Sequence, residues 1–341
     1  WGVESAVKHL IGMFAAALWD RQERKLYLIR DRLGIKPLYW GHFDGLFLFA
    51  SELKAMRAHP ECPSVINRNA LANYFRHNYI PGPATIYDGI FKLMPGTIMT
   101  VTRDGHIEQT KYWSLDDAVR QGSADIFSGT EREAIDSLDE LLRDAVGRRM
   151  VSDVPLGAFL SGGIDSSVVA AHMQAQSTRP INTFSIGFTE DGYNEAHHAA
   201  GVARHLGTCH TEFYVSPRDA MDVIPKLPDI FDEPFADSSQ IPTYLVSAMT
   251  REHVTVALSG DGGDECFAGY SRYFLAERIR RLQRYFPVSL RKLLSSGIYS
   301  CSPEHLDRLA GLLPASIRPG QFGHRLHKLA EVLLEEDDDF Y

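Results

Sequence analysis

The sequence has few cysteines for its length. Among 341 residues there are four: Cys62, Cys209, Cys266 and Cys301. Their spacing matches neither a disulfide framework nor the paired cysteines of a zinc site. We therefore expect reduced thiols, which are typical of cytoplasmic proteins.

Long hydrophobic runs and an excess of positive charge are also missing. The best apolar run, Met13 to Trp19, is far shorter than the roughly 18–20 residues that cross a bilayer. The 35 Lys and Arg residues are outnumbered by 44 Asp and Glu residues, which leaves a formal charge of −9. A nucleic-acid-binding surface is basic instead. The sequence therefore disfavours both a membrane protein and a nucleic-acid-binding protein.

What is present is the composition of a folded globular protein, with 44% hydrophobic and 23% charged residues. At roughly 100–200 residues per domain, the length predicts two domains. The chain begins at Trp1 rather than at a methionine, and we expect it to be a piece of a longer protein.

The first third of the chain, residues 1–113, has the pattern of short strands separated by tight turns. Asp44-Gly45 lies between two aromatic runs, and both residues tolerate the positive φ of a hairpin turn. Asp104-Gly105 indicates a second hairpin. We expect a β-rich unit with strands at 13–19, 26–29, 37–40, 46–49, 98–101 and up to Trp113, and a short helix that starts at Ser51.

Residues 114–129 are expected to form a linker, since the composition turns polar from 121 to 129. Directly after this interval, Thr130 and Glu133 have the spacing of a helix capping box. Apolar residues then recur with helical period from Ile135 to Val146. This pattern predicts a helix with one apolar face.

From residue 155 onward, strands alternate with helices. Such βαβ units require a parallel sheet with helices on both faces. We therefore expect an α/β domain over residues 130–341, helical beyond Tyr270. The expected strands are 155–160, 181–188, 211–215 and 254–258, and the expected helices are 166–174, 195–206 and 242–250.

The segment from Ser161 to Ser167, Ser-Gly-Gly-Ile-Asp-Ser-Ser, joins an apolar strand to a helix. Its glycines allow the backbone to approach a ligand, while N–H groups, hydroxyls and the helix dipole converge on one place. These properties indicate an anion site of pyrophosphate size. Neither the kinase-type phosphate loop nor a dinucleotide-binding glycine fingerprint is present. Asp165 within an anion site implies a bridging Mg²⁺.

A second glycine-rich acidic segment, Ser259 to Glu265, also follows an apolar strand. Loops at the carboxyl ends of neighbouring parallel strands converge over one crevice. We therefore expect Asp165 and Asp264 to bind one or two metal ions together.

These motifs carry a family resemblance. The Ser161–Ser166 segment is similar to the pyrophosphatase loop of the N-type ATP pyrophosphatases. Together with Asp232–Ser239 and Ser259–Tyr270, it resembles the glutamine-hydrolysing asparagine synthetases. Residues 12–20, 30–39 and 50–55 look like the second half of that family's glutaminase domain.

The resemblance implies a fold and a domain division. Residues 130–341 would form a parallel-sheet α/β ATP pyrophosphatase domain of the adenine nucleotide α-hydrolase type, cut short at its C-terminus. Residues 1–113 would be the C-terminal portion of a β-rich glutaminase domain of the N-terminal-nucleophile type, followed by the linker 114–129.

The resemblance also implies an activity. In this family the β-carboxylate of aspartate attacks the α-phosphorus of ATP, pyrophosphate leaves, and ammonia then displaces AMP. The implied cofactors are ATP and Mg²⁺, and the implied partners are aspartate and glutamine or ammonia. A homodimer is compatible with the resemblance.

Carried over by position, the resemblance assigns roles to individual residues. Ser161, Gly162, Gly163, Asp165 and Ser166 would hold the pyrophosphate. Phe159, Ile186, Ser259 and Gly260 would line the adenosine pocket. Asp165 and Asp264 would bind Mg²⁺, and Asp261 and Arg272 would act in catalysis.

One departure concerns the source of ammonia. The family's glutaminase uses an N-terminal cysteine whose own amine is the base, whereas this chain starts at Trp1 and Cys62 lies inside the β-rich unit. We therefore expect this chain not to hydrolyse glutamine, with free ammonia as the substitute. Two alternatives stay open: a related amidotransferase for another carboxylate (a sugar acid, a peptide or a β-lactam precursor), and a non-catalytic homologue.

Overall fold

A computed structural model describes residues 1–188, 196–285, 287–311 and 322–332. The chain forms two compact units, residues 1–259 and 260–341. Within the described ranges, no helix is both long enough and apolar enough to span a membrane.

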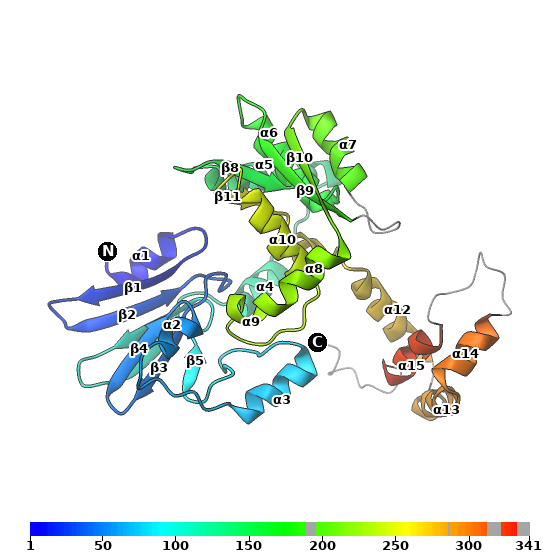
Figure 1. Ribbon diagram of the computed structural model, residues 1–341, viewed down its shortest axis with the longest axis horizontal. Helices are drawn as coiled ribbons and strands as arrows, with labels where there is room; N and C mark the ends of the chain where they lie inside the picture. Colours follow the sequence, from blue (N-terminus) through cyan, green and yellow to red (C-terminus); the bar gives the residue numbers. More distant parts are fainter. Residues whose placement is uncertain (189–195, 286, 312–321, 333–341) are drawn as a thin grey trace. The chain divides into compact units, whose positions relative to one another are not determined.

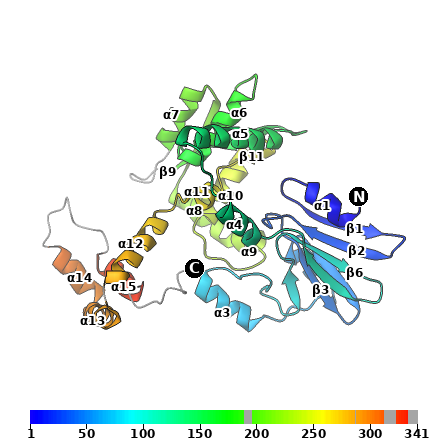
Figure 2. The same ribbon diagram turned by 180° about the vertical axis from the view of Figure 1, so that it is seen from behind.

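The β-rich region contains two antiparallel sheets, with strand orders β1-β2-β6-β7 and β4-β3-β5. Figure 2 shows β1, β2 and β6 side by side. Asp44 and Gly45 join β3 to β4 with φ values of 45° and 88°, which confirms the predicted hairpin. The strands are β1 (Ala15–Asp20), β2 (Lys25–Arg30), β3 (Tyr39–Phe43), β4 (Leu46–Ala50), β5 (Ile90–Lys92), β6 (Thr97–Val101) and β7 (Ile107–Lys111).

Three helices accompany these strands, and apolar side chains from both sheets form separate cores. Leu28 of β2 and Met99 of β6 are fully buried in one core. Leu53 and Ile90 belong to another, next to the shorter sheet. The helices are α1 (Val3–His9), α2 (Leu53–Arg57) and α3 (Arg68–His77).

Two helices connect the β-rich region to the parallel sheet. The interval 114–129 contains α4 (Leu115–Ala124), and α5 (Glu131–Arg149) follows it. The predicted capping box at Thr130 and Glu133 is confirmed. Of the expected apolar face of α5 only Val146 is buried; Leu141, for example, is 69% exposed. The reason is local: α5 packs on α6 near its C-terminal end, where Val146 lies.

The four strands of the α/β region form a parallel sheet, as the alternating pattern predicted, and their order is β10-β9-β8-β11. Figure 1 shows α6 and α7 on one side of it and α10 on the other. The strands are β8 (Leu156–Phe159), β9 (Asn182–Phe188), β10 (Cys209–Val215) and β11 (Val256–Leu258). The helices around it are α6 (Ile164–Ala175), α7 (Ala196–Leu206), α8 (Pro217–Val223), the 3₁₀ turn η1 (Ile224–Lys226), α9 (Leu227–Ile230) and α10 (Gln240–Thr250).

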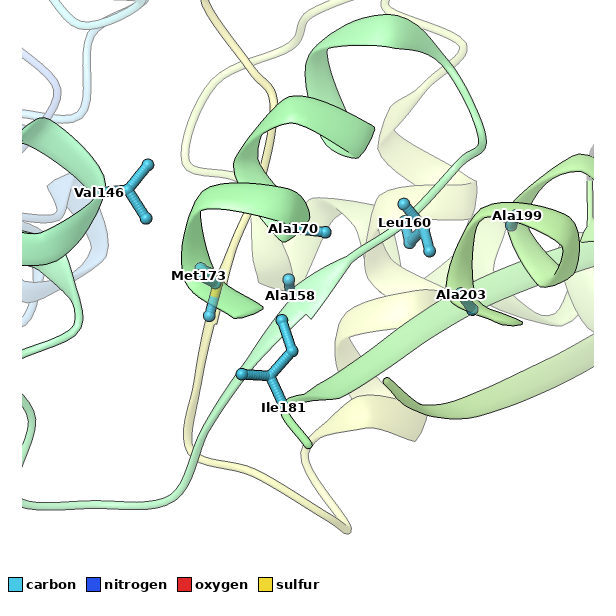
Figure 3. Packing of buried hydrophobic residues seen from close by; sticks show 8 residues of the cluster. All are labelled: Val146, Ala158, Leu160, Ala170, Met173, Ile181, Ala199 and Ala203. Carbon is cyan, nitrogen blue, oxygen red and sulfur yellow. The ribbon is translucent and has the colours of Figure 1, made fainter. Parts of the chain in front are cut away.

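Small side chains let the helices approach this sheet closely. Ala158 of β8, Ala170 of α6 and Ala199 of α7 are each 0% exposed. Figure 3 shows them in one cluster with the side chains of Leu160 and Met173. The packing therefore holds the start of α6 and the start of α7 next to the end of β8.

The second unit is helical in its described residues, as the sequence predicted beyond Tyr270. Its first helix, α11, is a short one that begins directly after Gly262. The helices are α11 (Gly263–Phe267), α12 (Ser271–Tyr285), α13 (Val288–Tyr299), α14 (Pro303–Ala310) and α15 (Phe322–Val332).

Candidate functional site

The Ser161–Ser167 segment lies at the point where the strand order of the parallel sheet reverses. Successive strands β8, β9 and β10 extend to one side of β8, whereas β11 pairs on its other side. Ligands of open α/β sheets bind outside the carboxyl ends of the strands at such a reversal. The segment leaves the carboxyl end of β8 and enters α6, so it occupies that position.

Gly162 adopts a conformation that only glycine accommodates without strain. Its φ is +83°. A Cβ atom at this position would lie 2.7 Å from the backbone nitrogen of Ala199 and 2.8 Å from the backbone carbonyl carbon of His198, both in α7. The glycine therefore lets the loop turn against the beginning of α7.

The serine hydroxyls shape the loop from inside. Ser166 is buried, and its Oγ accepts a hydrogen bond from the Ser161 N–H at 3.2 Å and lies 3.0 Å from the Ser161 Oγ. Ser167 donates from its Oγ to the Gly163 carbonyl at 2.6 Å. These contacts fix the loop in one shape, and the hydroxyl of Ser167, which the sequence predicted as a donor to the anion, donates to a carbonyl of the loop itself.

The first turn of α6 is open to a ligand. First-turn N–H groups have no acceptor within their own helix, and the N-cap residue is Gly163, which has no side chain to supply one. Asp165 lies half-buried in this turn. The turn thus combines backbone donors, the positive end of the helix dipole and one carboxylate, which is a suitable set for a phosphate with a cation.

Three of the four residues expected around adenosine, Phe159, Ile186 and Ser259, belong to this sheet or directly follow one of its strands. Phe159 pairs with Phe184, two residues before Ile186 in β9. Ser259 follows Leu258, which pairs with Ala158. A cavity of about 480 Å³ opens beside Phe159 on the α10 side of the sheet. Of the four predicted adenosine residues, Phe159 is the one that lines it; its wall is completed by Tyr244, Ser247, Ala248, Thr250, Arg251, Val254, Thr255, Val256 and Ala257.

The remaining predicted residues, Gly260, Asp261, Asp264 and Arg272, belong to the second unit. Gly260 and Asp261 lie in the loop before α11, where the next residue, Gly262, has φ +94°. The Asp264 carboxylate lies directly against Gly269, and its backbone carbonyl accepts a hydrogen bond from the Gly269 N–H at 3.0 Å. Arg272 is in α12, and its side chain is outside the part that the structure describes.

The two carboxylates predicted to bind Mg²⁺ lie in different units. Asp165 is in the first unit and Asp264 in the second. Over the described ranges, no group of three or more His, Cys, Asp or Glu residues is placed to hold a metal ion. The shared metal site of these two residues therefore stays a prediction.

Two further carboxylates, Asp232 and Glu233, form long-range hydrogen bonds that the sequence did not predict. Both form hydrogen bonds with the β-rich region, to residues 147 to 179 positions away in the chain. The sequence marked them within a family motif, but no local pattern indicated their partners.

Sequence comparison divides the chain in two. The family model described as asparagine synthase matches residues 137–341. The model described as glutamine amidotransferase domain matches residues 1–113. We refer below to residues 1–113 as the amidotransferase part and to residues 137–259 as the synthase part of the first unit.

Curated relatives agree with these matches. The chain is 41% identical over 295 residues to a putative asparagine synthetase [glutamine-hydrolyzing] 2 of Methanocaldococcus jannaschii, covering 84% of this chain and 56% of the relative. It is 37% identical over 292 residues to asparagine synthetase [glutamine-hydrolyzing] 1 of Bacillus subtilis, covering 85% and 44%. A putative asparagine synthetase of Mycobacterium bovis is 33% identical over 98% of this chain and 49% of its own length.

The chain thus spans about half the length of the curated relatives that it matches. The match to the synthase model covers more than half of the chain, and the relatives exceed 30% identity over most of it. The chain belongs to the asparagine synthase family.

Proposed function

We propose that the protein to which this chain belongs catalyses the ATP-dependent amidation of aspartate to asparagine, with AMP and pyrophosphate as the other products and glutamine as the source of ammonia. One observation supports this most. The Ser161–Ser166 loop and the open first turn of α6 lie at the strand-order reversal of a parallel sheet, in a chain whose relatives are named asparagine synthetases.

We assign the two activities to the domains predicted from the sequence. In this proposal residues 1–113 belong to the glutaminase domain, 114–129 connect, and 130–341 belong to the ATP-using domain; the family matches to residues 1–113 and 137–341 support it. The four cysteines are free, and we place the protein in the cytoplasm on that ground.

In the first step, a β-carboxylate oxygen of aspartate forms a bond to the α-phosphorus of ATP. The bond from that phosphorus to the bridging oxygen breaks, and pyrophosphate leaves with the electron pair. The backbone N–H groups of Ile164 to Ser166, in the first turn of α6, would donate to the charge that develops on the leaving group, whereas the Gly163 N–H already donates to the Ser161 Oγ at 3.3 Å. Phe159, Ile186, Ser259 and Gly260 hold the adenosine, which keeps the α-phosphorus in place.

In the second step, the ammonia nitrogen forms a bond to the acyl carbon of the adenylate, the carbon–oxygen bond breaks so that AMP leaves with the electron pair, and the nitrogen loses one proton to water. Asp261 acts in the adenylate step, and Arg272 offsets charge on the pyrophosphate side. The role of Asp261 comes from its position in the sequence motif, and that of Arg272 from its proximity to that motif.

The residues present fit Mg²⁺. This ion prefers oxygen ligands, keeps several waters, and takes only one or two protein carboxylates when phosphate oxygens complete its shell. Asp165 is a half-exposed carboxylate in the first turn of α6, and Asp264 is the second proposed ligand. Mg²⁺ held by these carboxylates would offset the repulsion between an anionic nucleophile and the triphosphate.

The test is pyrophosphate release from ATP and Mg²⁺ with ammonium and one carboxylic acid at a time. Release that depends on aspartate supports the proposal. Release that depends only on a sugar acid, a peptide or a β-lactam precursor would replace aspartate with that class of substrate. No release with any acid would identify a non-catalytic homologue.

A further inference from the structure

Asp232, a carboxylate of the synthase part, reaches into the amidotransferase part. Its Oδ2 accepts a hydrogen bond from the Leu53 N–H at 2.6 Å, and its Oδ1 accepts one from the Lys54 N–H at 3.3 Å. The Lys54 Nζ lies 3.6 Å from the same Oδ1. Only 10% of the Asp232 side chain is exposed. One carboxylate therefore holds the beginning of α2 through two backbone donors and an ion pair.

Glu233, the next residue, makes a second connection of the same kind. Its Oε1 accepts a hydrogen bond from the Ile86 N–H at 2.7 Å, and its Oε2 lies 2.7 Å from the Lys92 Nζ. The side chains of Glu233 and Lys92 are 12% and 17% exposed. Lys92 also donates to the Ile80 carbonyl at 2.6 Å, which fixes the direction of its ammonium group.

The surroundings of the two carboxylates are built for this contact. The Ala236 N–H donates to the Asn78 carbonyl at 2.8 Å, which adds a backbone bond between the two parts. Burial, together with the charges of Glu233 and Asp232, raises the pKa of Tyr39 to about 12. The phenol therefore stays neutral and adds no third negative charge.

Buried ion pairs of this kind are poor contributors to net stability, because desolvation offsets their attraction. Their best-attested task is to fix one arrangement among several. Here three backbone N–H groups and two ammonium groups, from Leu53, Lys54, Ile86 and Lys92, face two adjacent carboxylates. If one part slid or tilted on the other, buried charges would lose their partners. The contact therefore favours one relative position of the two parts, which we call their register.

We propose that Asp232 and Glu233 are positioning residues that hold the amidotransferase part in one register on the synthase part, and thereby secure the transfer of ammonia between them. This inference rests on the proposed function.

The chemistry explains why register matters. Hydrolysis of the glutamine side-chain amide yields glutamate and ammonia, and ammonia must reach the acyl carbon as an uncharged nucleophile. Ammonia that escapes into water at neutral pH is protonated to ammonium, whose nitrogen has no electron pair free to attack the acyl carbon. A loosened register therefore wastes glutamine without impairing the reaction with added ammonium salts, which supply ammonia from bulk solution.

The experiment uses the natural full-length protein with three measured rates: glutamate release from glutamine, amide formation with glutamine, and amide formation with ammonium. The test variants are Glu233→Gln, which removes the charge and keeps an acceptor for the Ile86 N–H, and Lys92→Met, which removes the same ion pair from the other side. Asp222→Asn, an exposed carboxylate on α8, is the matched control.

We expect both test variants to lower glutamine-dependent amide formation by about tenfold and to raise the ratio of glutamate released to amide formed above one. We expect ammonium-dependent amide formation to change by less than about twofold, and the control to match the wild type. An unchanged ratio in both variants, or an equal loss of all three rates in both, would overturn the proposal. Failure of the proposed function is recognised separately, as absence of ammonium- and aspartate-dependent product in the wild type.

Discussion

The neighbouring helices α5 and α6 begin in opposite ways. At the start of α5, the Thr130 Oγ1 accepts a hydrogen bond from the Glu133 N–H, and the Glu133 carboxylate accepts one from the Thr130 N–H at 2.7 Å. At the start of α6, the N-cap residue is Gly163, whose N–H donates to the Ser161 Oγ at 3.3 Å, but no N-cap side chain accepts from the N–H groups of the first turn, and the hydroxyls of Ser161 and Ser166 bond to each other. One helix satisfies its own first turn, whereas the other leaves that turn for something else to satisfy.

We interpret the start of α5 as structural and the start of α6 as functional. A capping box stabilises a helix by about 0.5–2 kcal/mol, so a start without one gives up local stability. In α6 this loss coincides with an acidic residue in the first turn and with a position at the strand-order reversal. An anion that binds there recovers the missing hydrogen bonds, and that is the role we propose for the pyrophosphate of ATP.

The largest expected effect comes from Gly162→Ala, which alters the open start directly. The positive φ and the close backbone of Ala199 and His198 leave no room for a methyl group. We expect pyrophosphate release to fall by at least about 10³-fold, because a displaced loop loses several oriented donors at once. The measurement is the steady-state rate with saturating ATP.

The control for this change is Gly201→Ala in α7. A Cβ atom at Gly201 meets nothing within 4 Å, and the residue is helical. We expect unchanged activity and a gain of roughly 0.5–1 kcal/mol in stability. Equal activity of the two alanine variants would contradict the claim that the loop needs glycine at position 162 because a methyl group does not fit there.

Asp165→Asn should have the next largest effect. The change keeps the size of the side chain and removes the negative charge in the first turn of α6 that we propose binds Mg²⁺. We expect a loss of about 10²-fold in pyrophosphate release, partly restored by raising the Mg²⁺ concentration. Asp153→Asn, at an exposed position before β8, serves as the comparison and should keep full activity. A wild-type rate for Asp165→Asn would exclude a metal-binding role.

Thr130→Ala tests the other helix. Loss of an N-cap hydroxyl costs about 1 kcal/mol of stability, so we expect a lower midpoint of thermal unfolding and an unchanged rate of pyrophosphate release. Loss of activity in the folded protein would show that the α5 start is functional too, and the contrast between the helices would disappear.

The smallest expected effect is a change in the stability of the fold at acid pH. Hydrogen bonds from the Thr130 backbone and hydroxyl lower the pKa of Glu133 below its ordinary value of 4.5. A carboxyl whose pKa is depressed in the folded state stabilises the fold above its unfolded pKa and loses that contribution as pH falls through the folded pKa. The difference in unfolding midpoint between wild type and Glu133→Gln should therefore be largest near neutral pH and shrink on acidification below about pH 4. A difference that stays constant from neutral to acid pH would contradict this assignment.

Local patterns predicted the features that depend on neighbouring residues. The hairpin at Asp44-Gly45 follows from two residues that accept positive φ, and the capping box at Thr130 follows from its spacing to Glu133. The start of α6 differs from the prediction by two residues, since the helix begins at Ile164 rather than at Ser166.

Features that depend on distant partners were not predictable in this way. The contacts of Asp232 and Glu233 join residues that lie 147 to 179 positions apart, and no periodicity encodes such a pairing. The helical periodicity predicted an apolar face on α5, yet Leu141 on that face is exposed. Periodicity indicates which side chains share a face of a helix but not which element packs against them. The polar interval 114–129 contains the helix α4, which Ser114 caps through the Asp117 N–H.

The central claim is that the α6 loop binds pyrophosphate as the leaving group of an attack on the α-phosphorus. Aspartate labelled with ¹⁸O in its β-carboxylate tests this directly, with ATP, Mg²⁺ and ammonium as the other reactants. Our account predicts that one labelled oxygen appears in AMP and that pyrophosphate stays unlabelled. Label in orthophosphate, with ADP as the nucleotide product, would place the attack at the γ-phosphorus and contradict it.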